Sequence, residues 1–510
     1  MNEMDPKLRF REAAKIAASD TQEETIPEPL GDEAQRVADL FSNRPYSSRL
    51  VAGVARMIDL AAILFFGFAI YFGYSLEDGA DWHYIAPILA GGILSIMLLQ
   101  AVDAYDLSVM RSLVTQFGRI FMAVTIVFAF FVTLAFFMKM GDYYSRFWFG
   151  AWYLSILSYF VASRFVLANM LRRWTRDGLL ERRAVIVGGG ANAEELIRSL
   201  ESQPDNDIRI CGIFDDRTGD RSPPSVAGYP KLGTIGQLIT FSRLAQLDLL
   251  IVSLPITAEA RVLKLLSKLW VLPLDIRLSA HTNKLRFRPR SYSYIGTVPL
   301  LDVFDKPIAD WDSLVKRLFD IVFASLALVL LFPVMILTAI AIRMESSGPV
   351  IFRQKRYGFN NDEIEVLKFR SMFHAMADPL AKNVVTKNDP RVTRVGRFIR
   401  KTSIDELPQL FNVLAGSLSL VGPRPHAVNA HTKDKRWEEV VDHYFARHKV
   451  KPGVTGWAQI NGWRGEVDTP EKIKNRVEHD LFYIENWSVL FDFNILMKTP
   501  FKLLNTENAY

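Results

Sequence analysis

The chain has 510 residues, a formal net charge of +6 at pH 7 and a mean hydropathy of +0.11. Half of its residues are hydrophobic although 23% are charged, so the apolar residues must be concentrated in particular segments, which argues against a purely soluble protein. The single cysteine, Cys211, excludes an intrachain disulfide framework and fits a reducing compartment. A chain of this length has room for about two to four domains.

The first 47 residues are polar and charged and show no apolar period. Such a segment has too little apolar surface to offset the entropy of folding. It also lacks the apolar core of a signal peptide. We therefore predict a disordered cytoplasmic tail over residues 1–47.

Four long apolar segments follow within residues 48–175. They cover residues 57–74, 84–102, 120–138 and 147–167. Each approaches or exceeds the length of about 18–20 residues that spans the hydrocarbon as a helix. Arginines precede the first segment and end or follow the fourth, whereas the loop at 76–81 is acidic. The excess of basic residues on cytoplasmic flanks predicts a four-helix transmembrane domain with both ends in the cytoplasm.

One acidic residue, Asp59, lies inside the first of these segments. An ionisable residue within a span is often functional. Because Asp59 lies near the cytoplasmic end, we expect it to snorkel or to pair with Arg56.

Residues 180–305 alternate between strand-like and helix-like patterns. A strand at 184–187 leads into Gly188-Gly189-Gly190-Ala191-Asn192-Ala193, which matches G-x-G-x-x-A, and a helical pattern begins at once. A second strand, at 208–214, ends in Asp215-Asp216, where a ribose-binding acid would lie. Further apolar runs at 247–253 and 274–279 are separated by a helical stretch. The alternation predicts a Rossmann-like or CoA-binding-like α/β domain with a small parallel sheet.

The ligand of this middle domain is a separate question. Gly188, Gly190 and Asp215 are the candidate cofactor contacts. Glycines also occur at such a turn simply because the chain reverses tightly, so a regulatory or structural role stays open. A membrane-anchored NAD-dependent nucleotide-sugar dehydratase and a non-catalytic nucleotide-sugar sensor are the alternative functions. None of the sixteen tyrosines begins the Tyr-x-x-x-Lys pair of such dehydratases, which argues against the first of them.

Residues 316–343 form a fifth apolar segment that is long enough to span a bilayer. Basic residues flank both ends, unlike the charge asymmetry of a spanning helix, and Pro333 removes a backbone donor past the middle. One interpretation is a re-entrant helix, kinked at the proline, that enters and leaves by the same leaflet. The other is an ordinary fifth span with a tolerated proline. The residues alone leave both open.

The adjacent acids Asp405-Glu406 lie between a run of arginines and the rigid Pro423-Arg424-Pro425. Residues 353–401 hold twelve Lys and Arg against five acids. A carboxylate that attacks a phosphate needs such cations, because its anionic target must be neutralised before the two groups can approach. The charge balance alone would equally suit nucleic acid or an anionic membrane surface. Ser403-Ile404-Asp405-Glu406 also matches a helix capping box.

Residues 312–510 resemble the bacterial sugar transferase family, the monotopic phosphoglycosyl transferases. The matching stretches, besides the segment that bears Pro333, are KRLFD at 316–320, GPVIFRQKRYG at 348–358, KFRSM at 368–372, TSIDELPQ at 402–409, LVGPRP at 420–425 and KPGVTGWAQI at 451–460. The whole layout resembles the large polyprenyl-phosphate hexose-1-phosphate transferases, and most of all the undecaprenyl-phosphate glucose phosphotransferases.

The resemblance implies a three-part fold. An α-helical membrane domain and an α/β Rossmann-like cytoplasmic domain would precede a mainly α-helical, membrane-associated catalytic domain with a re-entrant helix. Both termini and the catalytic domain would lie on the cytoplasmic side of the bacterial inner membrane. The partners implied are UDP-hexose, undecaprenyl phosphate and the lipid bilayer, and no nucleic acid. The hexose, the glycan pathway and a homo-oligomeric state stay open, with glucose or galactose and exopolysaccharide or another surface glycan expected.

The resemblance also implies roles for particular residues. Asp405 would attack the sugar-bearing phosphorus of UDP-hexose and release UMP, and undecaprenyl phosphate would then take the sugar phosphate from the aspartate. Glu406 would support Asp405 or hold Mg²⁺ with it, and Arg424 would donate to phosphate. Five further candidates for substrate binding lie in the matching stretches or the arginine run: Arg353, Lys355, Lys368, Arg370 and Arg400.

Overall fold

The computed structural model describes most of the chain. The described residues are 28–42, 46–74, 82–140, 143–176, 178–203, 208–217, 219, 222–254, 259–279, 292–295, 298–376, 389–426, 431–432, 435–437, 441, 444–463, 465 and 469–504. The chain divides into two compact units. One comprises residues 43–182 with 207–209, and the other comprises residues 1–42, 183–206 and 210–510.

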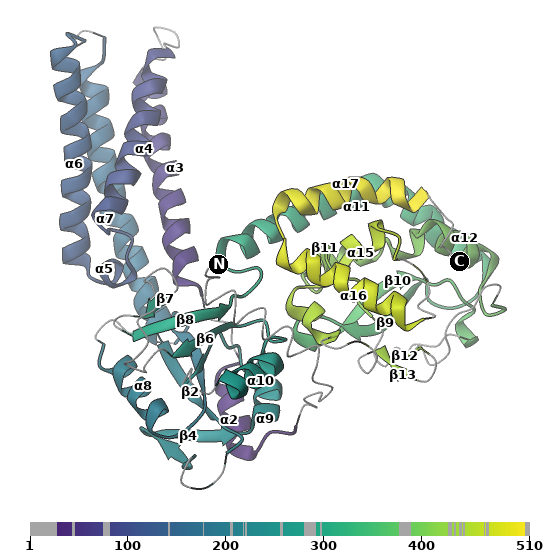
Figure 1. Cartoon of the computed structure of the whole chain (residues 1–510). Coiled ribbons are helices and arrows are strands. Elements are labelled where there is room, and N and C mark those ends of the chain that lie inside the picture. Colours follow the sequence, from purple (N-terminus) through teal and green to yellow (C-terminus); the bar gives the residue numbers. More distant parts are fainter. Residues whose placement is uncertain are drawn as a thin grey trace, which may run out of the picture. The chain divides into compact units, whose positions relative to one another are not determined.

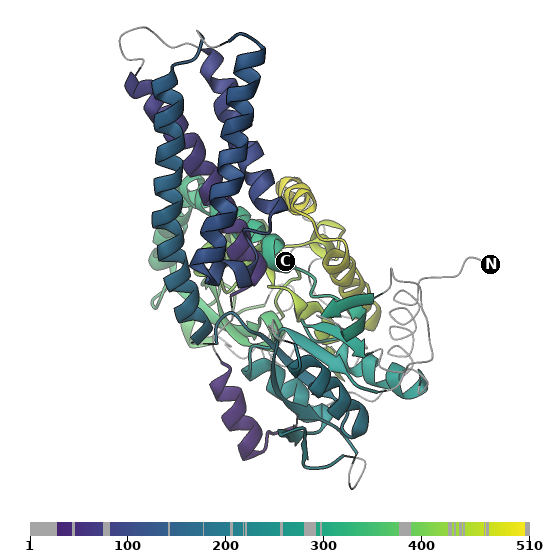
Figure 2. The ribbon, with the colours of Figure 1, turned by 90° about the vertical axis from the view of Figure 1, so that its left-hand side faces the viewer.

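The first unit is a bundle in which four apolar helices run side by side (Figures 1 and 2). Its elements are α3 (Ser48–Tyr74), η1 (Trp82–Tyr84), α4 (Ile85–Ala101), α5 (Leu107–Arg111), α6 (Leu113–Phe137) and α7 (Arg146–Arg176). By length and composition, α3, α6 and α7 could each cross a membrane, whereas α4 is shorter, at 17 residues. Three of the four predicted spans are therefore helices of spanning length, and the predicted span 84–102 is a helix below that length.

Tryptophans of α7 hold the bundle together by donating to the backbone of α3. The indole Nε1 of Trp148 donates to the carbonyl of Gly67 over 3.1 Å, and that of Trp152 donates to the carbonyl of Ile63 over 2.9 Å. Both rings are buried. A Cβ on Gly67 would lie 2.9 Å from Ile88, so the glycine lets α3 and α4 approach closely.

Asp59 does not pair with Arg56. Its Oδ2 accepts hydrogen bonds from Arg164 and, over 2.8 Å, from the hydroxyl of Tyr105, while its Oδ1 accepts from Tyr159 over 2.9 Å. Asp59 and Arg164 are 1% and 2% exposed. Arg56 instead reaches Gln100. The expectation was wrong because the helical turn directs Asp59 into the bundle, where only a partner from a distant helix can satisfy it.

Substitution of Arg164 by glutamine is expected to lower the free energy of unfolding by about 3–5 kcal/mol, because it leaves the Asp59 carboxylate buried without its cation. The measurement is thermal or chemical unfolding of the purified protein in detergent. Arg56→Gln is the matched control and should cost about 0–1 kcal/mol, since Arg56 is half-buried at most and its partner is neutral. Equal losses for the two variants would contradict a structural role for the buried pair.

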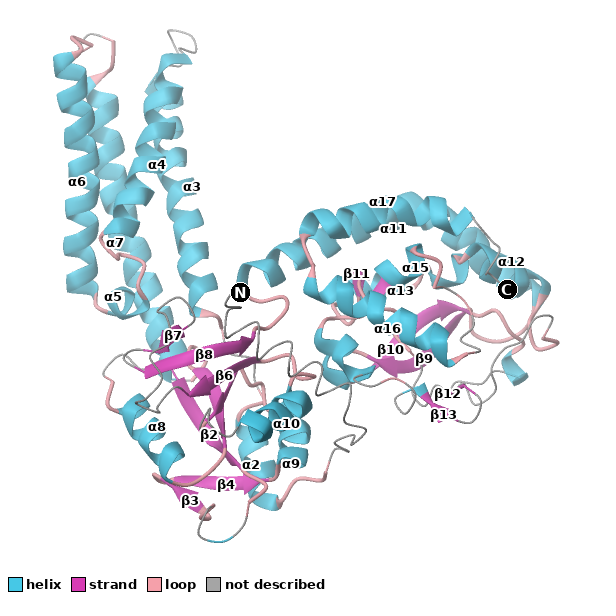
Figure 3. Ribbon diagram, in the orientation of Figure 1, coloured by secondary structure: helices cyan, strands magenta, loops and turns pink. Residues whose placement is uncertain are grey.

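The second unit begins with a mixed sheet of eight strands (Figure 3). The strands are β1 (Arg182–Val187), β2 (Ile208–Phe214), β3 (Ser225–Val226), β4 (Tyr229–Gly233), β5 (Leu249–Val252), β6 (Asp275–Ser279), β7 (Tyr292–Ile295) and β8 (Val298–Phe304). Their order is β3-β4-β2-β1-β5-β6-β8-β7. The pairs β1/β5, β5/β6 and β2/β4 are parallel, as predicted, but β8 runs antiparallel to both β6 and β7. The predicted small parallel sheet is therefore confirmed for these three pairs and wrong at the edge, where β8 pairs antiparallel with its neighbours.

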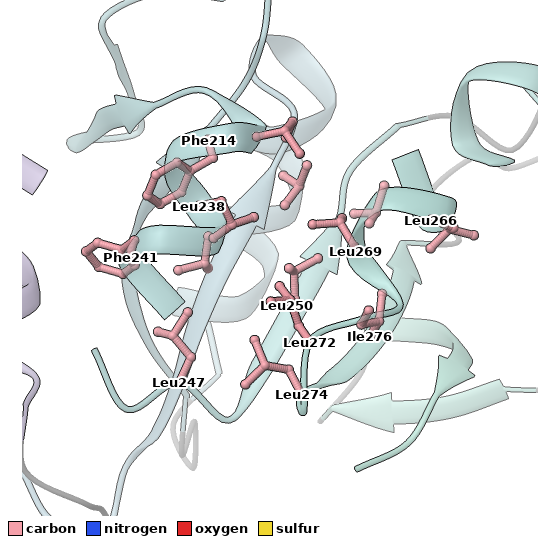
Figure 4. Close-up of a cluster of buried hydrophobic side chains, with 14 of the residues drawn as sticks. Phe214, Leu238, Phe241, Leu247, Leu250, Leu266, Leu269, Leu272, Leu274 and Ile276 are labelled. Atoms are coloured by element: carbon pink, nitrogen blue, oxygen red, sulfur yellow. The ribbon is translucent and has the colours of Figure 1, made fainter. Parts of the chain in front are cut away.

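Helices cover both faces of this sheet: α8 (Ala191–Glu201) on one, and α9 (Ile235–Leu244), α10 (Glu259–Leu269) and α2 (Asp32–Leu40) on the other. Figure 4 shows the apolar core beneath α9 and α10, to which β5 contributes Leu250 and β6 contributes Ile276. Alternation along buried strands sends side chains to both faces, which is why these strands read as continuous apolar runs.

Helix α2 corrects the prediction of a tail without structure over residues 1–47. Residues 1–27 lie outside the described residues, but Asp32–Leu40 is helical. Ala34 and Ala38 of this helix are buried in the same core as α9. Two alanines four residues apart give little apolar period, so the helix depends on docking and not on its own hydrophobicity.

The remainder of the second unit is the domain that the sequence predicted to be catalytic, and it carries the acid pair. Its helices are α11 (Asp310–Glu345), η4 (Phe359–Asn361), η5 (His374–Met376), α12 (Arg394–Thr402), η6 (Ile404–Glu406), α13 (Gln409–Ala415), η7 (Tyr444–Lys449), α15 (Trp457–Ile460), α16 (Pro470–Glu485) and α17 (Val489–Leu504). Its strands are β9 (Ile351–Tyr357), β10 (Glu363–Phe369), β11 (Ser419–Val421), β12 (His431–Thr432), β13 (Lys435–Arg436) and β14 (Gly453–Thr455). The pairs β9/β10 and β12/β13 are antiparallel, and β11/β14 is parallel.

Helix α11 contains Pro333 and is long and apolar enough to cross a membrane. Its N-terminal half buries Phe319 and Ala324 in a core with β11, α13 and α17. Its C-terminal half buries Met335 and Ile342 in a second core with β10 and α12. Both halves thus pack against one domain, while the opposite face exposes apolar side chains over the whole length of the helix.

Candidate active site

The acid pair occupies a tight turn between two helices. Helix α12 ends at Thr402, and Ser403 adopts the left-handed conformation with φ 59° and ψ 17°. The single turn η6 then carries Asp405 and Glu406, and Pro408 caps the start of α13. The Ser403 side chain makes no capping bond at η6. The capping-box interpretation is therefore wrong, because Ser403 is in the left-handed conformation, whereas an N-cap residue is typically extended.

Glu406 is the centre of a cationic frame. Its Oε1 accepts from the Nζ of Lys368 over 2.9 Å and from the Nη2 of Arg424, and its Oε2 accepts from the Nη1 of Arg424 over 3.1 Å. Lys368 comes from β10 and Arg424 from the loop after β11. Burial by itself would raise the pKa of Glu406, but Arg424 and Lys368 outweigh it and hold this pKa well below its usual range. Glu406 is thus ionised and fixed in place.

Asp405 differs from its neighbour in having no hydrogen-bond or ion-pair partner among the described residues, although it is half-buried. Burial raises the pKa of Asp405 to about 6, and the Glu406 carboxylate acts in the same direction. Lys368, Arg400 and Arg424 act against this rise. Such a carboxylate is ionised at neutral pH but poorly stabilised, which is the condition of a ready nucleophile.

The loop that carries Arg424 is fixed by contact between backbones. The amide of Gly422 donates to the carbonyl of Thr455 over 2.9 Å, and the amide of Gly453 donates to the carbonyl of Pro423 over 2.9 Å. A Cβ on Gly453 would lie 2.1 Å from the Gly422 nitrogen, and one on Gly456 would lie 2.2 Å from the Gly422 oxygen. Only glycine fits at these positions, so the VGPRP and KPGVTGW stretches form one structural unit.

The structure brings some predicted substrate-binding residues to the acid pair and leaves others elsewhere. Lys368 and Arg424 contact Glu406, and Arg400 lies close enough to lower the pKa of Asp405. Arg353 and Lys355 are exposed and form surface ion pairs with Glu365 and Glu363.

Arg370 lies at the C-terminal end of α11. Its guanidinium donates to the carbonyls of Ser346 and Ser347 over 2.8 and 2.7 Å. It therefore caps a helix, and it makes no contact with the acid pair among the described residues.

A residue that the sequence prediction missed, Arg356, lies behind the Pro-Arg-Pro loop. Its Nη1 donates to the carbonyl of Pro425, and its charge faces Arg424, Glu406 and Asp405. Burial and the neighbouring Arg424 lower the pKa of Arg356 to about 10, so it stays charged. Strand alternation could have found it, because β9 directs Arg353 and Lys355 outward and therefore Arg356 inward.

The predicted cofactor contacts of the middle domain lie together at the end of β1. Gly188 and Gly190 have positive φ, of 99° and 85°. The Asp215 Oδ2 accepts from the amide of Gly189 over 2.7 Å and also binds Arg217. The carboxylate thus covers the glycine turn on which a dinucleotide would place its pyrophosphate.

Comparisons with known proteins agree with the resemblance drawn from the motifs. A model of the family described as bacterial sugar transferase matches residues 311–506, and one described as CoA-binding domain matches residues 100–280. The chain is similar to the UDP-glucose:undecaprenyl-phosphate glucose-1-phosphate transferases of Escherichia coli K12 and Klebsiella pneumoniae. It is 40% identical to the first over 66% of this chain and 71% of that protein, and 34% identical to the second over 92% and 100%.

A third relative is the exopolysaccharide production protein PSS of Rhizobium leguminosarum bv. phaseoli, which is 44% identical over 37% of this chain and 94% of that protein. These matches cover both the catalytic domain and the layout before it. The chain belongs to the bacterial sugar transferase family.

Proposed function

We propose that this protein transfers glucose 1-phosphate from UDP-glucose to undecaprenyl phosphate and releases UMP, as the first membrane step of the synthesis of an exopolysaccharide or another surface glycan. The names of its relatives support the substrates and the pathway class. The observation that carries the proposal is the arrangement of two neighbouring acids: Asp405 has no partner among the described residues, and Glu406 is held by two cations.

The reaction would proceed by double displacement. A carboxylate oxygen of Asp405 attacks the sugar-bearing phosphorus of UDP-glucose, and the bond from this phosphorus to the bridging oxygen breaks, so that UMP leaves with its electron pair. An oxygen of undecaprenyl phosphate then attacks the same phosphorus and expels the aspartate. The product is undecaprenyl diphosphate glucose, and Asp405 is regenerated. Two steps, each with one anionic nucleophile, replace a single step in which three anionic groups would meet at once.

The cations around the acid pair have two tasks. Lys368 and Arg424 hold Glu406, and with Arg400 they lower the negative potential that an incoming diphosphate would meet at Asp405. A guanidinium fork is suited to bind two phosphate oxygens at once. Arg424 would therefore share its donors between Glu406 and the substrate.

We also propose that Mg²⁺ takes part. The described residues contain no group of three His, Cys, Asp or Glu side chains that could hold a metal ion by themselves. Mg²⁺ is usually bound by one or two carboxylates together with substrate phosphates, so the acid pair fits an ion delivered with the nucleotide. Asp405 and Glu406 would hold it, and it would neutralise phosphate charge.

A direct assay tests the function. The purified protein with UDP-glucose, undecaprenyl phosphate and Mg²⁺ should release UMP, and release should stop with EDTA and return with added Mg²⁺. Release of UDP would instead mean a glycosyl transfer and would refute the proposal. A panel of UDP-sugars in the same assay would identify the hexose, with UDP-glucose expected to react fastest.

The pH dependence of the first displacement is a second test. Because Asp405 must be ionised to attack, kcat/KM for UMP release should fall about tenfold per pH unit below about pH 6 and level off above it. Measuring a single turnover without undecaprenyl phosphate removes the titration of the lipid phosphate from the profile. An activity that persists unchanged to about pH 4 would show that the nucleophile has an ordinary aspartate pKa.

The membrane arrangement is also a proposal. We propose that α11 is re-entrant, with both of its ends, both termini of the chain and the catalytic domain on the cytoplasmic side of the bacterial inner membrane. The packing of both halves of α11 against the one catalytic domain supports this, as do the basic residues at both ends of the helix. Labelling of single cysteines placed at residues 314 and 344 of a Cys211→Ser variant in intact cells would test it. Opposite accessibility of the two positions would refute it.

The middle domain is proposed to be Rossmann-like and to hold a phosphorylated ligand. A cavity of about 170 Å³ lies beside Gly188 and Asp215, and α10 lines it with Arg261, Lys264 and Lys268. The match to a CoA-binding domain supports such a ligand. Calorimetric titration with coenzyme A and with NAD⁺ tests this, and loss of binding is expected when Arg261 and Lys268 are both replaced by glutamate. No heat of binding from either compound would count against it.

A further inference from the structure

Each carbonyl of the Pro-Arg-Pro loop has a fixed donor. The carbonyl of Pro423 accepts from the Gly453 amide over 2.9 Å, and the carbonyl of Pro425 accepts from Arg356. The carbonyl of Arg424 itself accepts from the Nη2 of Arg447 over 2.7 Å. The first two donors belong to elements already tied to the site. Arg447 comes from η7, which the reaction proposed above does not use.

Arg447 is fully buried and fully engaged at its two terminal nitrogens. Its Nη2 also donates to the Oδ2 of Asp480 over 2.5 Å, and its Nη1 contacts the ring of His426. Arg447 and Asp480 are 0% and 2% exposed. The guanidinium lies over the ring of Tyr444, with its Cζ 5.5 Å from the ring centroid. One side chain therefore ties η7, α16 and the Pro-Arg-Pro loop together.

A buried ion pair needs a reason, because two hydrophobic side chains of similar volume would stabilise a fold at least as well. The direction in which the Arg447 guanidinium points supplies this reason. One of its nitrogens donates to the main-chain oxygen of Arg424, which lies between two prolines that already restrict the chain. From this fixed backbone the Arg424 side chain extends to Glu406, and its guanidinium donates to the Glu406 carboxylate.

We propose that Arg447, held by Asp480, is a positioning residue that orients Arg424 toward Glu406 and the phosphates of the sugar nucleotide. Arg447 touches neither reacting group. This inference rests on the proposed function, in which Arg424 binds the diphosphate. It predicts that the contribution of Arg447 exists only when Arg424 is present.

A double-mutant cycle tests this dependence. Arg447→Lys keeps the charge but loses the fork, and Arg424→Ala removes the group that is positioned. The two variants and their combination are compared with the wild type by kcat/KM for UMP release and by the dissociation constant for UDP-glucose. Arg447→Lys should lower kcat/KM and raise the dissociation constant, each by about tenfold or more, when Arg424 is present. In the Arg424→Ala background each of these changes should be less than about threefold. Equal factors in both backgrounds would overturn the inference.

Arg317→Lys is the matched control, since Arg317 donates to the carbonyls of Val413 and Leu414 in the same domain, away from the loop. Its effect should be the same in both backgrounds. Asp480→Asn is the second variant if Arg447→Lys does not fold, and it should show the same dependence on Arg424 to a smaller degree. A wild type that binds UDP-glucose without releasing UMP would refute the proposed function, while the coupling in the dissociation constants would still support the positioning role.

Discussion

Replacement of Asp405 by asparagine is expected to lower UMP release by about 10³-fold or more, because an amide cannot form the acyl phosphate bond on which both proposed displacements depend. The variant keeps the size of the side chain and removes only its negative charge. The measurement is the rate of UMP release at saturating UDP-glucose. Intact mass spectrometry of wild type incubated with UDP-glucose alone should show one added hexose phosphate, and the variant should show none.

Loss of folding would not explain this loss of activity. The pKa of Asp405 is raised to about 6 from an ordinary value of 3.8, so the folded state binds its proton more tightly than the unfolded state does. Stability therefore falls as the pH rises through this interval and stays lower above it. At neutral pH the asparagine variant should be at least as stable as the wild type in thermal unfolding. A variant that is stable and still releases UMP at the wild-type rate would remove Asp405 from the mechanism.

Replacement of Glu406 by glutamine is expected to lower kcat/KM by about 10²-fold. Three charge-assisted hydrogen bonds of about 1.5–3 kcal/mol each hold Lys368 and Arg424 to this carboxylate, and a neutral amide leaves both cations without a compensating charge. The remaining activity should have a different pH profile. Because the Glu406 charge helps to raise the pKa of Asp405, its removal should move the acid limb of the profile to lower pH.

Glu363→Gln is the control for this substitution, since Glu363 forms an exposed ion pair with Lys355 on the hairpin that also carries Lys368. Its activity and its acid limb should match those of the wild type. If Glu406→Gln lowers activity with no movement of the limb, Glu406 acts without influencing the charge of Asp405, and the electrostatic account of the pair fails.

The motifs grouped residues that the structure also places together. Asp405, Glu406 and Arg424 were singled out because their stretches resemble those of the family, and Arg424 contacts Glu406 in the structure. Their roles in the reaction stay a prediction. Lys368 was predicted to bind substrate because it lies in a stretch that resembles the family, and the structure shows that it contacts Glu406. The prediction failed to separate Arg353 and Lys355 from Arg356. It relied on the number of charges in the segment, whereas successive side chains of a strand point to opposite faces.

Contacts between distant segments set the limit of the sequence prediction. Arg447 contacts Arg424 and Asp480, which lie 23 and 33 residues away in the chain, and no local pattern marks such a triad. The same holds for Asp59, whose partner Arg164 is 105 residues away. Helix α2 and the antiparallel edge of the sheet were missed for a related reason, since their stability comes from docking and not from a local period.

The packing of α11 has a practical consequence for anyone who wants this enzyme without detergent. Deleting the helix would remove Phe319 and Ala324 from one core and Met335 and Ile342 from another, and the truncated domain should not fold. The outer face of the same helix is different, because Val329, Leu330 and Leu337 are 74%, 67% and 67% exposed and support neither core. A water-soluble catalytic domain is therefore to be sought by replacing these outer side chains with glutamate and lysine while every inward residue of α11 is kept.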